Sequence, residues 1–249
     1  MVEKDIEIKT NDGVTDAVLF FDAENKLPGV IHLTDIGGIR PSQRQMARQL
    51  AEKGYTVLMP NVFYRTSRPP VIQFDFYRAD EQTRKQRIAE LAGPLTPEAM
   101  ESDAAAYVDF FAGQKSVKDG PMGVVGYCFT GSMAMRIAAV RPQKIMAAAS
   151  FHGGRLYTDA PTSPHLLLPR IKAQLYFGHA ENDGSMPADA IGKLDAALAA
   201  WGGKYESEVY KGAAHSWTVP DSPVYNPAQA EPAFQKLTAL FSLTLKPRG

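Results

Sequence analysis

Short apolar segments alternate with longer amphipathic ones along most of the chain. Continuous apolar runs are typical of strands buried on both faces, whereas apolar residues recurring every three or four positions are typical of helices. The predicted buried strands cover residues 29–33, 55–59, 122–126, 145–151 and 172–178, and the predicted helices cover residues 42–53, 96–113, 132–139, 187–201 and 227–240. This alternation favours an α/β fold, with a mostly parallel sheet and helices on both faces.

Two parts of the chain alternate polar and apolar residues, which is typical of strands with one exposed face. Residues 5–9 and 15–21 flank Asn11-Asp12-Gly13, a hairpin signal, and should pair as antiparallel strands at one edge of the sheet. Residues 204–210 alternate in the same way and predict an edge or half-exposed strand.

Capping signals and one irregular segment complete the expected organisation. Ser42 is expected to cap the helix over 42–53, and Thr96 with Pro97 opens another helix. Residues 61–95 are the least regular part of the chain, and we interpret them as a loop-and-helix insertion near the active site. No internal repeat interrupts the pattern. The expected organisation is therefore a single α/β domain over residues 1–249.

Composition argues against several functional classes. The 249 residues are 45% hydrophobic and 22% charged, and 27 basic residues balance 27 acidic ones. A neutral chain gives no reason to expect nucleic acid or a membrane surface as partner. No apolar run reaches the roughly 18 residues that a bilayer requires, and the N-terminus lacks a signal-peptide core. The single cysteine cannot form an internal disulfide and suits a cytoplasmic location.

The sequence carries none of the common motifs for metals or nucleotide cofactors. Five scattered histidines and one cysteine do not give zinc-ligand spacing. No phosphate-binding Walker loop occurs, and no G-x-G-x-x-G follows a predicted strand. We therefore expect neither a metal nor a cofactor.

The only cysteine, Cys128, lies where a predicted strand passes directly into a predicted helix. Gly126 and Gly131 flank it and allow the strand and the helix to approach closely. A nucleophile on such a turn forms a nucleophile elbow, and the N-terminal dipole of the helix favours a thiolate there. The alternative is a small buried hydrophobic residue, as free cysteines often are. Ser132 is a poor alternative nucleophile because it lies a turn inside the helix.

An acid and a histidine follow the cysteine, each after its own strand. Asp183 comes after the strand over 172–178, and His215 comes after the strand over 204–210. The order nucleophile, acid, histidine is that of α/β-hydrolases. Ligand sites of parallel sheets lie beyond the carboxyl ends of the strands, so the three residues should meet at one edge. Considered alone, Asp183 could be a turn or capping residue and His215 an exposed loop histidine. Together with Cys128 they predict a catalytic triad.

The three motifs carry a family resemblance that extends from about residue 5 to about residue 241. Gly126-Tyr127-Cys128, Glu181-Asn182-Asp183 and Ala214-His215-Ser216 resemble the triad motifs of the dienelactone hydrolase family, which has the α/β-hydrolase fold. The resemblance implies hydrolysis of a carboxylic ester or lactone. It also implies that an acid after the strand over 29–33, here Asp35, interacts with the resting thiol and helps govern its ionisation.

Three features depart from the family pattern. Asp35 stands where the family usually has the longer glutamate, and Thr130 stands two residues after the cysteine, where glycine is usual. The carboxylate-binding arginine expected shortly after the histidine is absent from residues 216–220. Neither Trp nor Val replaces a bidentate arginine. A neutral or differently shaped ester, lactone or thioester is therefore as good a substrate candidate as an anionic dienelactone.

Two backbone N–H groups are expected to form the oxyanion hole. One belongs to Phe129, the residue after the nucleophile, and the other to Ile36, in the loop after the early strand. Gly37 and Gly38 either let that loop fold tightly around an oxyanion or form a plain turn.

Three further side chains are candidates for contact with substrate: Arg78, Tyr64 and Trp217. Arg78 matches a second anion-binding arginine that the resemblance implies, or is a solvated surface residue. Tyr64 follows a strand end and is expected to line the pocket. Trp217 either forms an aromatic wall or packs in the core. His152-Gly153-Gly154 comes after the nucleophile, which is the wrong place for a lipase-type oxyanion motif, so we expect a loop close to the site.

The sequence thus predicts a hydrolase of carboxylic esters or lactones. Cys128 attacks the carbonyl and forms a thioester acyl-enzyme, Asp183 orients His215, and His215 transfers the protons and activates the water. The expected partner is a small-molecule substrate, and the expected assembly is a monomer or small homo-oligomer. The alternative is a non-hydrolytic protein on the same fold that binds a ligand or senses redox state through Cys128.

Overall fold

The computed structural model describes residues 1–245, and in this part of the chain eight strands form one sheet. The strands are β1 (Val2–Thr10), β2 (Gly13–Phe21), β3 (Gly29–Leu33), β4 (Thr56–Pro60), β5 (Met122–Tyr127), β6 (Ile145–Phe151), β7 (Gln174–Asn182) and β8 (Tyr205–Ala214). The helices are α1 (Pro41–Glu52), α2 (Glu81–Ala92), α3 (Pro97–Ala112), α4 (Thr130–Val140), α5 (Ala188–Trp201), α6 (Pro227–Thr244) and a 3₁₀ helix at Pro164–Arg170.

The sheet has the order β1-β2-β4-β3-β5-β6-β7-β8. β2 pairs antiparallel with β1 and β4, and the other neighbouring pairs are parallel. The predicted hairpin is confirmed, since Thr10 pairs with Gly13 across the turn at one edge. The half-exposed strand predicted near residue 205 is also confirmed, because β8 forms the opposite edge. The α/β class predicted from the alternation of segments is therefore correct.

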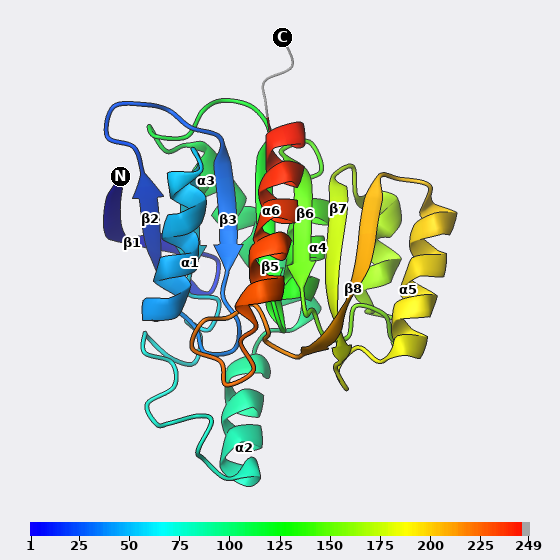
Figure 1. Ribbon diagram of the computed structural model, residues 1–249. Coiled ribbons are helices and arrows are strands. Elements are labelled where there is room, and N and C mark those ends of the chain that lie inside the picture. Colours follow the sequence, from blue (N-terminus) through cyan, green and yellow to red (C-terminus); the bar gives the residue numbers. More distant parts are fainter. Residues whose placement is uncertain (246–249) are drawn as a thin grey trace.

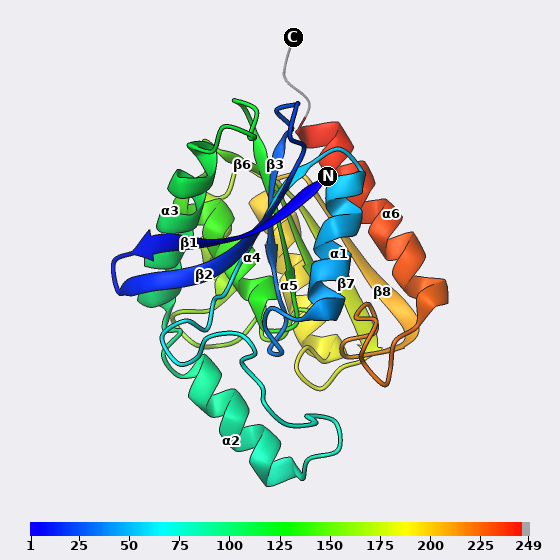
Figure 2. The same cartoon turned by 90° about the vertical axis from the view of Figure 1, so that its left-hand side faces the viewer.

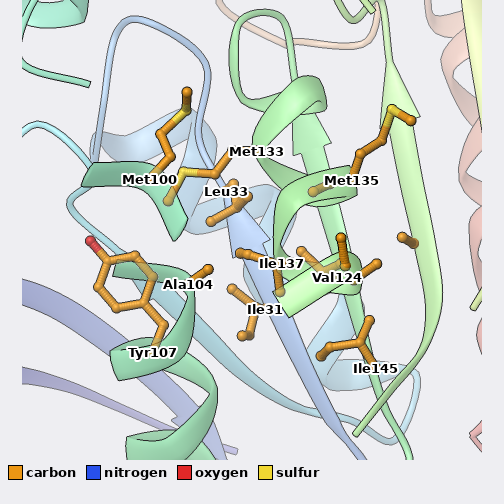
Figure 3. Close-up of a cluster of buried hydrophobic side chains, with 14 of the residues drawn as sticks. Ile31, Leu33, Met100, Ala104, Tyr107, Val124, Met133, Met135, Ile137 and Ile145 are labelled. Carbon is orange, nitrogen blue, oxygen red and sulfur yellow. The ribbon is translucent and has the colours of Figure 1, made fainter. Parts of the chain in front are cut away.

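Helices cover both faces of the sheet, and the strands supply apolar side chains to each face. In Figure 2 the helices α1 and α6 lie on one side of the sheet and α3 and α4 on the other. On β3, Val30 belongs to the cluster beneath α1 and α6, whereas Ile31 and Leu33 belong to the other cluster. Figure 3 shows that second cluster, which contains Ile31 and Leu33 together with Ile137 of α4 and Tyr107 of α3. Burial on both faces holds the central strands, and with them the strand ends that carry the site.

The segment over residues 61–95 contains α2 and the irregular chain before it. In Figure 1, α2 projects beyond the carboxyl ends of the parallel strands, away from the rest of the sheet. Only Leu91 of α2 is buried. This segment therefore lies at the end of the sheet where ligand sites of α/β folds form.

Two predicted helix starts differ from the structure. Ser42 does not cap α1, because Pro41 already occupies the first turn and Arg40 is the N-cap residue. The fixed φ of proline is compatible with the first helical position, so the helix begins there. α4 begins at Thr130, two residues before the predicted start. The capping prediction at Thr96 is confirmed, since its side chain accepts from Ala99 N–H.

Candidate active site

The turn between β5 and α4 holds Cys128 in a left-handed backbone conformation, with a φ of 58°. This conformation is costly for a residue with a Cβ, and it persists only where the surroundings fix the turn. The Cys128 N–H donates to the carbonyl oxygen of Phe151 and to Nδ1 of His152, both at 3.1 Å. These bonds fix the turn that presents the thiol at the carboxyl end of the sheet.

Close packing of β5 against α4 explains the residues on either side of Cys128. A Cβ on Gly126 would lie 2.6 Å from the carbonyl carbon of Thr130 and 2.9 Å from the nitrogen of Gly131, so glycine is required there. The Thr130 hydroxyl accepts from Tyr127 N–H at 3.0 Å and lies 3.3 Å from the carbonyl oxygen of Leu33. The threonine at this position therefore satisfies buried backbone groups.

The structure brings the three predicted triad residues together at the carboxyl edge of the sheet. His215 follows β8, and its Nε2 lies 3.0 Å from Sγ of Cys128. Asp183 follows β7, and its Oδ2 lies 2.6 Å from Nδ1 of His215. The other oxygen of Asp183 accepts from the N–H and the hydroxyl of Ser185, at 2.9 and 2.6 Å. The carboxylate is therefore held so that it fixes the imidazole with Nε2 toward the thiol.

Charge coupling between these residues is strong. Burial lowers the pKa of His215, but its bonds to Asp183 and Cys128 outweigh burial and raise the pKa to about 10. Burial raises the pKa of Asp183, and the bonds from His215 and Ser185 reverse this, so the pKa is lowered. Because the pKa of His215 lies above its ordinary value of 6.5, its pairing stabilises the fold fully below pH 6.5. That stabilisation is lost as the pH rises through about 10.

We predict that Asp183→Asn lowers the pKa of His215. Both the hydrogen bond from Asp183 and its charge raise this pKa, and asparagine carries no charge. An NMR titration of the His215 ring in each variant measures the effect. Asp189→Asn is the matched control, because Asp189 pairs with Lys193 on α5 and should leave His215 unchanged. An unchanged His215 titration in Asp183→Asn contradicts the pairing.

The amides expected to form the oxyanion hole belong to Phe129 and Ile36. Phe129 directly follows Cys128 at the N-terminus of α4, where backbone N–H groups and the helix dipole favour a negative charge. Ile36 lies in the loop between β3 and α1 and lines the same cleft as Cys128. Within residues 1–245, neither amide donates a hydrogen bond to another protein atom. Neither N–H group is therefore engaged by another group of the described residues.

A cleft of about 540 Å³ opens above Cys128 and His215. Its walls come from the β3–α1 loop, the segment over 61–95 and the loop over 216–226. The lining residues are Asp35, Ile36, Gly37, Arg40, Pro70, Ile72, Phe74, Phe76, Tyr77, Ile88, Cys128, His215, Ser216, Asp221, Ser222, Pro223 and Val224. This volume is within the range of small-molecule sites.

Asp35 lies in the cleft, but its carboxylate is paired with Arg40. Its two oxygens accept from Nη1 and Nη2 of Arg40 at 2.5 and 2.9 Å, and one also accepts from Gly37 N–H at 3.0 Å. In residues 1–245 no hydrogen bond joins Asp35 to Cys128, whose thiol is bonded to His215. The contact with the resting thiol implied by the family resemblance is therefore absent. Arg40 was not among the site residues predicted from the sequence, although it follows Asp35 closely in the same loop.

Two candidate substrate contacts lie away from the cleft. The Tyr64 hydroxyl is 2.9 Å from a carboxylate oxygen of Asp103 and 2.7 Å from the Thr10 hydroxyl. These bonds draw Tyr64 to the β1–β2 hairpin, so the prediction that it lines the pocket is wrong. The side chain of Arg78 is 89% exposed and pairs with Asp75 at 3.4 Å. Arg78 is also absent from the cleft lining, so the structure contradicts its predicted contact with substrate.

Trp217 is a core residue. It is fully buried, and its ring lies 4.2 Å from the ring of Tyr210 and 6.4 Å from the ring of Phe151, measured between centroids. It does not line the cleft, so of the two readings of Trp217 the structure supports packing. A large aromatic side chain gains most by complete burial, which explains this outcome.

His152 is a buried residue that accepts a hydrogen bond from the turn at Cys128. Its ring is buried, and its Nε2 lies 2.8 Å from the Thr218 hydroxyl while Nδ1 accepts from Cys128 N–H. Burial lowers the pKa of His152 well below its ordinary value, so the ring is neutral and Nδ1 remains an acceptor. The loop over 152–154 was predicted to lie close to the site, but the sequence indicated no role for His152. Its position directly after β6 was the only available signal.

The described residues contain no group of three or more His, Cys, Asp or Glu side chains arranged to hold a metal ion. Among the helices over residues 1–245, none is long and apolar enough to cross a membrane.

Known proteins share this fold and these motifs. The family model for the dienelactone hydrolase family matches residues 15–245. A carboxymethylenebutenolidase from Rhodococcus opacus is 29% identical over 220 residues, covering 85% of this chain and 79% of the relative. The crystal structure of a candidate dienelactone hydrolase from Klebsiella pneumoniae superposes with a TM-score of 0.83 at 22% identity, covering 97% of this chain and 98% of the other. That of a dienelactone hydrolase from Anabaena variabilis gives 0.71 at 16% identity, covering 98% and 99%.

The sheet order, the elbow and the neighbouring structures place the chain in the α/β-hydrolase fold class. Within that class, the chain belongs to the dienelactone hydrolase family, whose model matches nearly its whole length. It is accordingly a hydrolase, as the sequence predicted.

Proposed function

We propose that this enzyme hydrolyses carboxylic esters or lactones through a thioester acyl-enzyme on Cys128. The observation that carries the proposal is the alignment of Cys128, His215 and Asp183, with contacts of 3.0 and 2.6 Å, at the floor of a cleft. A nucleophile, a base within hydrogen-bond reach and a group that orients the base are the requirements of acyl transfer.

Acylation follows from this geometry. His215 Nε2 already holds the proton of the Cys128 thiol, in keeping with its raised pKa, when Sγ attacks the substrate carbonyl carbon. The carbonyl oxygen becomes an oxyanion and accepts from the N–H groups of Phe129 and Ile36. The C–O bond to the alcohol then breaks, and the alcohol oxygen takes the proton from His215. A thioester remains on Cys128, and in a lactone the new hydroxyl stays attached to the acyl chain.

Deacylation reverses the proton transfer, with water as the donor. His215 takes a proton from water as the water oxygen attacks the thioester carbonyl, and the same amides hold the second oxyanion. The C–S bond breaks, the carboxylic acid leaves, and Sγ departs as a thiolate beside protonated His215, which restores the resting pair. Asp183 remains ionised throughout and stabilises the imidazolium that forms in each half-reaction. No metal or cofactor is required by this scheme.

Trapping the intermediate tests the proposal. We predict that mixing the enzyme with 4-nitrophenyl acetate and quenching in acid yields protein heavier by one acetyl group. Peptide mapping should place that group on Cys128, and hydroxylamine at neutral pH should remove it, as expected for a thioester. The matched control is enzyme alkylated with iodoacetamide before substrate is added, which should acquire no acetyl group.

Acetylation at another residue contradicts the proposed nucleophile. If no adduct forms and no 4-nitrophenol is released, the result favours the non-hydrolytic alternative, in which the protein binds a ligand or senses redox state. Family membership does not support that alternative.

A further inference from the structure

The cleft above Cys128 is walled by apolar side chains that remain partly open to solvent. Ten large hydrophobic residues are exposed in the described part of the chain, and four of them line this cleft: Phe74, Tyr77, Ile88 and Val224. Phe74 stacks on Phe76, with ring centroids 6.4 Å apart, so the aromatic wall is preformed. Exposed apolar side chains gathered around one opening indicate a surface that a ligand covers.

The only guanidinium in the cleft lining is that of Arg40, and its hydrogen-bonding capacity is used up by the protein. Nη1 donates to Asp35 at 2.5 Å and to the Gly38 carbonyl oxygen at 3.3 Å, and Nη2 donates to Asp35 and Asp221 at 2.9 and 3.0 Å. Nε donates to the other oxygen of Asp221 at 2.8 Å. A guanidinium has five N–H donors, so none remains for a substrate carboxylate.

The lining formed by residues 1–245 offers an anion no unpaired cation. Asp35 and Asp221 both pair with Arg40, the His215 ring pairs with Asp183, and no lysine in this part of the chain lines the cleft. The Asp35 side chain is buried, whereas that of Asp221 lines the cleft and is 44% exposed. Burial raises the pKa of Asp221, but the bonds from Arg40 outweigh it and lower the pKa, so this carboxylate is ionised at neutral pH.

We propose that the cleft selects neutral esters carrying an apolar acyl chain and rejects substrates that carry a carboxylate, with Asp221 as the specificity-determining residue. This inference rests on the proposed ester hydrolysis. Asp221 acts in two ways: it occupies two donors of Arg40, and it adds a negative charge at the opening. The apolar chain of a neutral ester lies against Phe74, Phe76 and Tyr77 and displaces water from them.

A pair of substrates with the same leaving group tests this selection. The 4-nitrophenyl ester of hexanoic acid and the 4-nitrophenyl monoester of adipic acid have acyl chains of equal length, and only the latter ends in a carboxylate. We expect kcat/KM for the hexanoate to exceed that for the adipate by about tenfold or more. In Asp221→Asn this ratio should fall by roughly tenfold, because the charge is removed and Arg40 gains a free donor.

Two controls separate this effect from changes in stability. Asp109→Asn is the matched control, since Asp109 binds Arg141 through the same two-oxygen contact far from the cleft lining, and it should leave the ratio unchanged. If Asp221→Asn does not fold, the ratio of kcat/KM for the two esters is measured instead for the wild type at increasing ionic strength. Screening should then reduce the ratio as ionic strength rises.

The outcomes distinguish this inference from the proposed function. Equal or preferred hydrolysis of the adipate overturns the selection but leaves ester hydrolysis intact. A ratio that neither Asp221→Asn nor salt alters overturns the role of Asp221. No turnover of either ester overturns the proposed function itself.

Discussion

Replacing Cys128 with alanine is expected to reduce kcat/KM for 4-nitrophenyl hexanoate by roughly 10⁴-fold or more. In the proposed mechanism the Cys128 sulfur forms the covalent bond to substrate, and deletion of a triad nucleophile in related chemistry has effects of this order. The amides of Phe129 and Ile36 would remain, so a small residual rate above that of water is expected. Release of 4-nitrophenolate, followed at saturating and at low substrate, measures the loss.

Ser132 is the matched control for Cys128. It lies in the first turn of α4, and its hydroxyl donates to the carbonyl oxygen of Phe129 at 3.0 Å, so it is directed back at its own helix. Ser132→Ala should therefore retain turnover within about threefold, since it loses one hydrogen bond of the usual modest value. Full activity in Cys128→Ala together with a large loss in Ser132→Ala would reverse our assignment of the nucleophile.

The positions of Cys128, Asp183 and His215 could be predicted because each directly follows a strand of the sheet. The carboxyl ends of parallel strands lie at one edge, so sequence order and strand assignment are sufficient to bring such residues together. The same reasoning gave the alternation of strands and helices, since apolar periodicity reports burial directly. A residue whose place depends on the sheet is therefore predictable without knowledge of the loops.

The charged residues of the cleft could not be predicted in this way. Arg40 is held by Asp35 from its own loop and by Asp221, which is distant in the sequence and comes from a loop on the other side of the cleft. Arginine has a long flexible side chain, and its partner depends on which loops meet. Arg78 illustrates the converse, because its neighbour Tyr77 lines the cleft while Arg78 points into solvent.

Buried polar partners were the other source of error. Tyr64 follows the end of a strand, which suggested a pocket residue, but the carboxylate of Asp103 is fully buried and requires donors. Tyr64 and Arg65 satisfy that carboxylate and are thereby drawn to the β1–β2 hairpin. A buried charge must be paired, and this requirement prevails over the position of a residue in the chain.

Gly126→Ala is expected to destabilise the protein by about 3 kcal/mol or more, enough in some conditions to prevent folding. The added Cβ would lie 2.6 Å from the carbonyl carbon of Thr130 and 2.9 Å from the nitrogen of Gly131, and it would also meet the Thr130 oxygen. These are backbone atoms, so relief requires α4 to move away from β5 and cannot come from a change of rotamer. Urea denaturation of the purified variant measures the free energy of unfolding.

Gly192→Ala tests whether the loss of stability is specific to position 126. Gly192 lies within α5, and a Cβ there would meet nothing within 4 Å. Since alanine favours helix over glycine, this variant should be more stable by about 0.5–1 kcal/mol. Opposite signs for the two changes in stability would show that contact with α4 makes glycine necessary at 126.

The same separation of α4 from β5 would displace the Phe129 amide from Cys128. Any folded Gly126→Ala protein should therefore also hydrolyse esters more slowly than the wild type.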